Sequence, residues 1–303
     1  MKIGLLFPGQ GAQVVGMGGV LASRSAAARG MFELAQQVLG FDLLKLCAEG
    51  PADKLNRTEY SQPALFVHSM AALRQLEADR PNVWDEVLAV AGLSLGEYTA
   101  VAAAGGIDFE AGLRLVQLRG TAMQQAADAV PSGMSSVIGL ERERLEAICT
   151  AATSGPHLVR VANLLCPGNI AISGHLEALE AAERLSVEAG AIKTIRLPVA
   201  GAFHTPIMQP AVDKLSAALE SVDFRITRVP VFSNVDALPH TQPTEFRRLL
   251  SEQVIDPVLW ESSLENMLAA GCEQFIEVGT GRILAGTLKR IRRKISCENV
   301  GDS

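Results

Sequence analysis

Short apolar runs that end in turns alternate along the chain with longer segments whose apolar residues recur at helical spacing. Runs of this kind predict strands at Lys2–Phe7, Val87–Ala91, Pro230–Ser233 and Gln274–Val278. Helices are predicted at Ser25–Leu39, Phe41–Cys47, Ser61–Asp79, Glu97–Ala104, Phe109–Ala127, Gln209–Ser221, Glu245–Gln253, Trp260–Ala270 and Ile283–Lys294. Strands that alternate with helices favour an α/β fold whose central sheet is mainly parallel.

The pattern changes between Pro131 and Pro198. It predicts strands at Ser132–Gly139, Leu158–Leu164, Asn169–Ser173 and Ile192–Leu197, with helices at Glu141–Thr153 and Leu176–Ala189. The order β-α-β-β-α-β is typical of a ferredoxin-like unit. We therefore expect a small ferredoxin-like subdomain at residues 129–198, inserted into a larger α/β catalytic subdomain formed by residues 1–128 and 199–303. The small subdomain is expected to form one wall of a cleft.

Composition narrows the class of protein. The chain has 303 residues, of which 48% are hydrophobic and 20% charged, so it can form a sizeable core. A formal net charge of -6 argues against nucleic acid as a partner. No membrane span or signal peptide is expected, which favours a cytoplasmic protein. The 5 cysteines are scattered and include no CxxC pair, so neither disulfides nor a metal site are indicated.

The most informative stretch is Gly92-Leu93-Ser94-Leu95-Gly96, which stands between a predicted strand and a predicted helix. Strand, tight Gly-x-Ser-x-Gly turn and helix form the setting of a nucleophilic serine. The glycines allow strand and helix to approach closely, and free N–H groups at the helix start favour developing negative charge. The alternative is an ordinary turn in which Ser94 caps the helix.

A nucleophilic serine needs a base, and His204 is the best candidate among the five histidines. It lies in the glycine-containing loop Gly201–Pro206, and catalytic groups are often carried by loops. The aspartates between Ser94 and His204, Asp108 and Asp128, both occupy helix ends. A serine–histidine dyad oriented by a group other than a carboxylate therefore fits better than a triad.

Two further features are ambiguous from pattern alone. The loop Pro8–Gln13 follows a strand, where ligand sites of α/β proteins gather, but it lacks the glycine spacing of a dinucleotide site and the residues of a P-loop. Arg119 falls in the middle of a predicted helix, and its position alone favours exposure to solvent.

Six motifs, taken together, resemble the malonyl-CoA:acyl carrier protein transacylases of fatty acid synthesis, which are related to the acyltransferase domains of polyketide synthases. The match covers nearly the whole chain, and the motifs stand in the family's order: FPGQGAQ at Phe7–Gln13, GLSLGEY at Gly92–Tyr98, QLRG at Gln117–Gly120, GAFHTPIM at Gly201–Met208, EQVIDPVLW at Glu252–Trp260 and EVGTGRIL at Glu277–Leu284. The resemblance implies an α/β-hydrolase-like large domain and an acyl-carrier-protein S-malonyltransferase activity.

The resemblance also implies a role for each matching residue. Ser94 matches the nucleophile and His204 its general base and acid. Arg119 matches the arginine that binds the malonyl carboxylate, which reverses the expectation of exposure. The other matches are backbone N–H groups of an oxyanion hole at Gln10 and Leu95, a residue that helps to orient the histidine at Gln253, and substrate-site residues at Asn163 and Phe203. Phenylalanine before the histidine is typical of malonyl-selective relatives.

Two positions depart from the family pattern. Leu93 stands where a histidine usually precedes the serine, and Leu165 stands where a second asparagine is frequent. The position of Leu93 does not carry proton transfer, so activity is expected to survive, whereas Leu165 puts a minor polar contact in the cleft in doubt. Leu93 is expected to change packing or hydrogen bonds beside the turn.

The implied reaction is ping-pong transfer of malonyl from coenzyme A to the phosphopantetheine thiol of acyl carrier protein, through a malonyl ester of Ser94. It needs no metal or other cofactor, and no nucleic acid or membrane partner. We expect a monomer. The basic cluster Lys289–Lys294 is either a docking surface for an acidic carrier protein or a solvated helix end.

Three alternatives remain at this point. A serine esterase or lipase would place a carboxylate against His204 and would hydrolyse its ester without a thiol acceptor. A non-catalytic scaffold that binds carrier protein would not need Ser94, His204 and Arg119. A malonyl-transferring subunit of polyketide assembly or malonate decarboxylation would share every motif.

Overall fold

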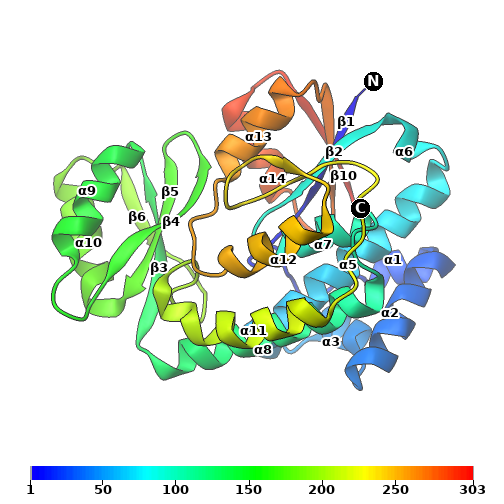
Figure 1. The fold of residues 1–303 in the computed structure, drawn as a ribbon, viewed down its shortest axis with the longest axis horizontal. Coiled ribbons are helices and arrows are strands. Elements are labelled where there is room, and N and C mark those ends of the chain that lie inside the picture. The colour runs from blue at the N-terminus through cyan, green and yellow to red at the C-terminus, as the bar shows by residue number, and fades with distance from the viewer. Residues whose placement is uncertain (1, 303) are drawn as a thin grey trace.

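A computed structural model describes residues 2–302 and contains two β-sheets (Figure 1). The larger sheet has the strand order β10-β9-β1-β2-β7-β8. Its strands are parallel except β8, which runs antiparallel to β7. They span β1 Ile3–Phe7, β2 Val87–Gly92, β7 Val231–Phe232, β8 Pro239–His240, β9 Gln274–Val278 and β10 Ser296–Val300. The expected mixed α/β fold with a mainly parallel central sheet is confirmed.

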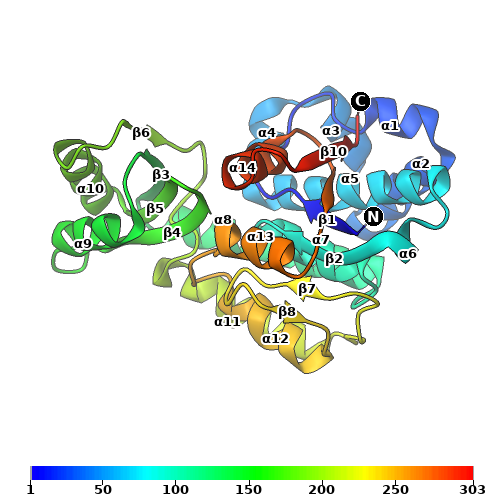
Figure 2. The same cartoon turned by 90° about the horizontal axis from the view of Figure 1, so that it is seen from above.

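Helices cover both faces of this sheet because neighbouring strand residues point to opposite sides. Leu5 packs into the cluster formed with the helices that lie on one side, whereas Leu6 packs into a second cluster with α13 and α14 (Figure 2). The helices of the first side and the connecting helices are α1 Gly19–Arg24, α2 Ala26–Leu39, α3 Leu43–Glu49, α4 Ala52–Asn56, α5 Thr58–Asp79, α6 Val83–Glu86, α7 Leu95–Ala103, α8 Phe109–Ala129, the 3-10 turn Pro206–Met208, α11 Gln209–Ser221 and α12 Pro243–Glu252. The second side carries α13 Trp260–Ala269 and α14 Ile283–Ile291.

The smaller sheet is antiparallel and has the order β4-β5-β3-β6. Its elements follow the predicted order β-α-β-β-α-β: β3 Ser132–Ile138, α9 Arg142–Ala152, β4 Val159–Cys166, β5 Asn169–His175, α10 Leu176–Glu188 and β6 Lys193–Arg196. The two helices share an apolar cluster of their own with the sheet. This group forms the separate green lobe of Figure 1.

Hydrogen bonds join the two lobes. The segment after α12 pairs with β4, where the N–H of Val258 donates to the carbonyl of Ala162 (2.8 Å) and the N–H of Leu164 donates to the carbonyl of Val258 (2.9 Å). The guanidinium of Arg290 donates to the carbonyl of Pro167 (2.8 Å). The segment that follows α12 therefore belongs structurally to both lobes.

Several features differ from the sequence-based expectations, and helices α1, α4 and α6 were not expected. Helix α5 begins at Thr58, so Pro63 lies in its second turn instead of the first. Helix α14 ends at Ile291, because the chain turns so that Ile295 returns to the same apolar cluster as Ile291. Only Lys289 and Arg290 of the basic cluster are therefore helical. Strands β8 and β10 were not expected, since β8 has only two residues and most of β10 is polar.

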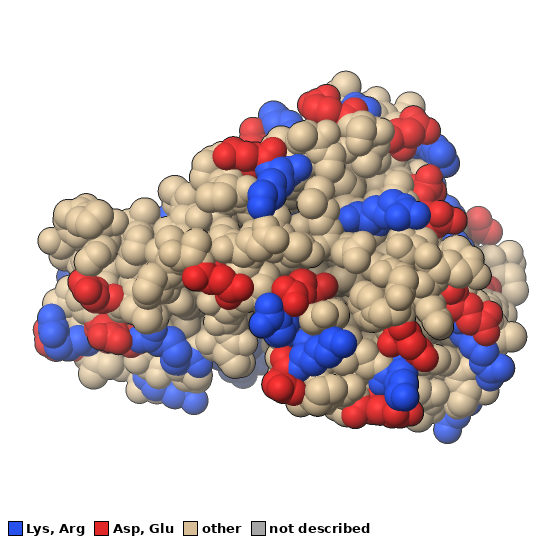
Figure 3. Space-filling view, turned by 90° about the horizontal axis from the view of Figure 1, so that it is seen from below, with Lys and Arg blue, Asp and Glu red and all other residues tan. Residues whose placement is uncertain are grey.

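Charged side chains on the face shown in Figure 3 are mixed in sign and form no extended basic patch. Across residues 2–302 no helix is both long and apolar enough to cross a bilayer.

Candidate active site

The turn between β2 and α7 is held tight by its glycines. A Cβ atom on Gly92 would overlap the backbone of Gly96, and a Cβ on Gly96 would overlap the carbonyl of Phe7. Ser94 stands between them with φ 50° and ψ -105°, a strained conformation for a residue with a side chain. It occupies the N-cap position, but its side chain caps no backbone N–H. The capping interpretation of Ser94 is therefore wrong, and its hydroxyl is free for other partners.

The hydroxyl of Ser94 lies 2.9 Å from Nε2 of His204. Nδ1 of the same ring lies 2.7 Å from the backbone carbonyl of Gln253, which can only accept, so Nδ1 carries the proton and Nε2 is left as the acceptor. Burial, and then the nearby charge of Arg119, lower the pKa of His204 to about 4. The imidazole is therefore neutral at pH 7 and ready to accept the serine proton.

Arg119 is 1% exposed, so the expectation of a solvent-facing side chain is wrong. Its guanidinium donates to Oγ of Ser94 (3.1 Å) and to the amide oxygens of Gln62 (2.8 Å) and Gln253 (2.9 Å). It also lies 5.1 Å from the ring centre of Tyr98. Burial lowers its pKa from a high ordinary value. No described carboxylate forms an ion pair with it, and its Nε has no partner. The site thus holds a buried cation, away from solvent, beside the serine.

The loop Pro8–Gln13 runs against the serine turn. A Cβ on Gly9 would overlap the carbonyl of Leu93, and the N–H of Leu93 donates to the carbonyl of Phe7 (3.0 Å). Gln10 follows directly, and Leu95 is the first residue of α7. Within residues 2–302 the backbone N–H groups of Gln10 and Leu95 donate to no protein acceptor. Both donors are therefore available to an oxyanion.

Two polar residues of the site, Asn234 and Glu97, were missed by the sequence analysis. The side chain of Asn234 accepts from the N–H of Ser94 (2.7 Å) and donates to the carbonyl of Gly92 (2.8 Å), so it clamps both ends of the turn. The buried carboxylate of Glu97 accepts from the side-chain amide of Gln253 (2.6 Å) and from the N–H of Asn234 (3.2 Å). A glutamate in an otherwise apolar helix, and an asparagine at the end of the strand beside β2, were the available signals.

Asn163 and Phe203, the two residues expected in the substrate site, have surroundings that differ from those of Ser94 and His204. Phe203 precedes His204 and packs into the large apolar cluster. Asn163 lies on β4 of the smaller sheet, opposite Val258, and its Oδ1 is buried without a partner. Neither side chain makes a described hydrogen bond to Ser94.

Both departures from the family pattern are apolar side chains that pack into or against one apolar cluster. Leu93 is buried in the cluster that contains Leu6 and Phe232, and Leu165 packs against that same cluster from β4. The two leucines therefore extend the apolar contact between the lobes.

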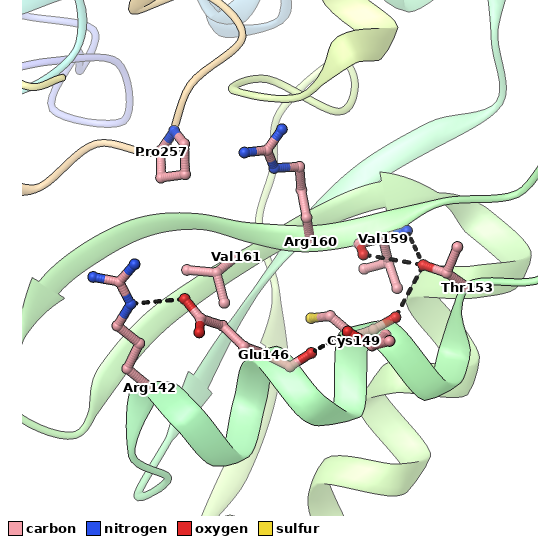
Figure 4. Close-up of a pocket in the computed structure, with 9 residues that line it drawn as sticks. Arg142, Glu146, Cys149, Thr153, Val159, Arg160, Val161 and Pro257 are labelled. Carbon is pink, nitrogen blue, oxygen red and sulfur yellow. Dashed lines mark hydrogen bonds and ion pairs between the residues drawn. The ribbon is translucent and has the colours of Figure 1, made fainter.

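A separate hollow of about 420 Å³ lies between α9 and β4 and contains none of these residues (Figure 4). Its one nucleophilic side chain is Cys149, and burial raises the pKa of that thiol to about 12. The thiol therefore stays protonated at pH 7. Among the described residues, no group of three metal-ligating side chains is present.

Comparison with known proteins agrees with this geometry. Residues 5–300 match the model of the acyl transferase domain family, so the chain belongs to that family. A relative from Mus musculus, named mitochondrial malonyl-CoA-acyl carrier protein transacylase, is 42% identical over 302 residues, which are 96% of this chain and 79% of the relative. The Bacillus subtilis malonyl CoA-acyl carrier protein transacylase is 38% identical and covers 99% of this chain and 94% of its own length.

Solved structures give the same result. A malonyl-transacylase solved in complex with a type II PKS acyl-carrier protein has a TM-score of 0.93 and 37% identity, and the match covers 100% of this chain and 97% of that one.

Proposed function

We propose that this protein transfers a malonyl group from coenzyme A to the phosphopantetheine thiol of an acyl carrier protein. The observation that carries the proposal is the buried guanidinium of Arg119, which donates to Ser94 and to neutral amides but to no carboxylate. A buried, planar guanidinium beside a nucleophile can pair with an acyl group that ends in a carboxylate. An acetyl group would leave the guanidinium without an anionic partner.

In the first half-reaction Oγ of Ser94 attacks the thioester carbonyl while Nε2 of His204 takes the hydroxyl proton. The N–H groups of Gln10 and Leu95 donate to the oxyanion of the tetrahedral intermediate. The C–S bond then breaks, and the coenzyme A thiolate leaves with the proton from His204. The carbonyl of Gln253 holds Nδ1–H throughout, so Nε2 always faces the reacting atoms.

The second half-reaction repeats these steps with the carrier protein. His204 takes the proton of the phosphopantetheine thiol, the sulfur attacks the Ser94 ester, and the serine oxygen leaves with that proton. The related transacylase in complex with an acyl-carrier protein supports this partner. The pathway, whether fatty acid synthesis, polyketide assembly or malonate decarboxylation, depends on which carrier protein the cell supplies.

The finer architecture is part of the proposal. We assign residues 1–128 and 199–303 to an α/β-hydrolase-like catalytic subdomain, and residues 129–198 to a ferredoxin-like subdomain that forms the far wall of the substrate cleft. Asn163 and Phe203 would line that cleft, and a narrow cleft would protect the ester from water. No cofactor is required by the steps above. A monomer and a cytoplasmic location stay predictions, since the mouse relative is named mitochondrial.

A serine hydrolase is the main alternative. In a hydrolase triad the histidine Nδ1 donates to a carboxylate, whereas here it donates to the carbonyl of Gln253. This contact favours the transferase.

Intact-mass measurement after mixing with malonyl-CoA tests the proposal. We expect a malonyl adduct on the wild-type protein, its removal by phosphopantetheinylated carrier protein, and no adduct on Ser94→Ala. Acetyl-CoA should give much less adduct. Absence of a malonyl adduct would overturn the proposed function, and equal acetylation would overturn the role of Arg119.

A further inference from the structure

Glu97 is a carboxylate that the reaction steps above do not use, although it lies one amide away from the substrate-binding cation. It belongs to α7, three residues after Ser94, and is 1% exposed. The Gln253 amide connects the two charges: its oxygen accepts from Arg119 (2.9 Å), and its nitrogen donates to Oε2 of Glu97 (2.6 Å). A guanidinium can only donate and a carboxylate can only accept, so this amide orientation satisfies both.

No cation pairs directly with Glu97 among the described residues. The titratable and charged groups near it are Arg119 on α8, Tyr98 on α7 and Asp236 after β7, and His204 lies beyond Gln253. Arg119 is the one permanent positive charge in this group. The free site therefore contains one buried cation and one buried carboxylate, and the two are separated by an amide.

A malonyl group would bring a second carboxylate to Arg119. Two buried anions around one cation carry an uncompensated charge, which is unfavourable in a dry site. We infer that Glu97 is a positioning residue that couples malonyl recognition to the uptake of one proton: it is ionised while Arg119 has no acyl partner, and it is protonated when the malonyl carboxylate binds. This inference rests on the proposed function and goes beyond it, because it names a residue that sets how malonyl binding depends on pH.

The local contacts can accommodate that proton. Oε2 of Glu97 accepts from Gln253 and from Asn234, and the Ser233 hydroxyl is a further hydrogen-bonding neighbour. A proton from solvent placed on Oε1 leaves both contacts of Oε2 intact. Burial, which outweighs these hydrogen bonds, raises the pKa of Glu97 to about 7, so the carboxylate of the free site is mainly ionised above about pH 7 and can take up a proton there.

The direction of the pH dependence separates Glu97 from His204. The pKa of His204 is lowered to about 4, so its ionisation does not change the rate above about pH 6. Ionised Glu97 opposes the malonyl carboxylate, so kcat/KM for loading should fall as the pH rises through about 7. A base such as His204 would give the opposite slope.

The test is the rate of malonyl-ester formation from malonyl-CoA, followed by intact mass without carrier protein. For the wild type we expect kcat/KM to fall about fivefold or more between about pH 6.5 and about pH 8.5, mainly through KM. Glu97→Gln should remove the slope, and Glu97→Asp should restore it. Glu277→Gln is the matched control, because Glu277 is also buried with a raised pKa but is held by N–H groups of α14. That variant should keep the wild-type slope.

A binding measurement covers the case in which the Glu97 variants fail to fold. Ser94→Ala cannot form the ester, so mixing it with malonyl-CoA in weak buffer containing a pH dye reports protons taken up on binding. We expect uptake approaching one proton near about pH 7.5 with malonyl-CoA and none with acetyl-CoA. Malonyl-CoA binding without proton uptake, or a wild-type slope retained by Glu97→Gln, would overturn the inference. Failure of the wild type to form a malonyl ester at any pH would instead overturn the proposed function.

Discussion

At the scale of single residues, the main feature of this site is a positive charge that is buried away from water. Arg119 is surrounded by amide oxygens, a hydroxyl and the Tyr98 ring, each of which offsets only part of the cost of burying a guanidinium. A substrate that supplies a carboxylate gains an interaction that the folded protein alone lacks. On the proposed function, selectivity for malonyl would arise because Arg119 has no carboxylate partner within the protein.

Arg119→Ala tests this origin of selectivity. Removing the guanidinium should reduce kcat/KM for malonyl loading by about 100-fold or more, because a buried charge-assisted pair is lost. Acetyl loading should stay the same or rise, since the neutral group no longer meets an unpaired cation. Initial rates of ester formation with both thioesters measure the ratio. A parallel loss with malonyl-CoA and acetyl-CoA would show that the arginine supports the fold instead of the specificity.

At the scale of elements, the strand–turn–helix unit works because β1, β2 and α7 approach more closely than side chains allow. Gly96 faces the carbonyl of Phe7 and has no room for a methyl group. By contrast, Gly30 lies inside α2, and a Cβ there would meet no atom within 4 Å.

The two glycines should therefore respond oppositely to alanine. Gly96→Ala should lower the free energy of unfolding by about 3 kcal/mol or more, because the backbone of β1 must move. Gly30→Ala should raise it by about 1 kcal/mol through helix propensity. Denaturant unfolding of both variants measures the difference. Equal effects would mean that the turn tolerates the extra methyl by shifting as a unit.

Helices and strands were the part of the structure that the sequence predicted best. The spacing of apolar residues identified β1, β2, β9 and the β-α-β-β-α-β order. Each of these elements buries one face, and the apolar residues of that face recur along the sequence at the period of a strand or a helix. His204 was chosen as the base for Ser94 from its loop position and chemistry, but Arg119 joined the site only through the family resemblance, since contacts between distant segments have no local pattern. Asn234 and Glu97 were missed because a single polar side chain in a buried position has no periodicity.

At the scale of the whole molecule, the segment after β10 is fastened to α5 and to the start of α1. Oδ2 of Asp302 lies 2.8 Å from Nε2 of His68 in α5, and Oδ1 accepts from the N–H of Gly18 (2.7 Å). The last described residue therefore fastens β10 and the end of the chain to the segment that follows the Pro8–Gln13 loop. Burial alone would raise the pKa of Asp302, but the hydrogen bonds from His68 and Gly18 outweigh it and lower the pKa.

Asp302→Asn should weaken the contacts with His68 and Gly18 in a pH-dependent way. A carboxyl whose pKa is lowered by folding stabilises the fold above its unfolded pKa, and that contribution is lost as the pH falls through the folded value. We expect the free energy of unfolding of the variant to be about 1–2 kcal/mol lower than that of the wild type at pH 7, and this difference to shrink below about pH 4. Asp223→Asn, at an exposed pair with Arg225, should change stability by less than about 0.5 kcal/mol. Thermal unfolding at both pH values measures this.

The backbone angles of the two reacting residues bear on how the protein can be improved. Ser94 has φ 50° and His204 has φ 61°, and Ala237 (φ 59°) is the one other described residue besides glycine with a positive φ. At such positions glycine relieves strain, so screening of variants for thermal tolerance alone would favour glycine where the nucleophile and the base stand. Engineering for stability should therefore keep Ser94 and His204 unchanged and make substitutions elsewhere, because the strained backbone lies at the two residues that the proposed reaction uses.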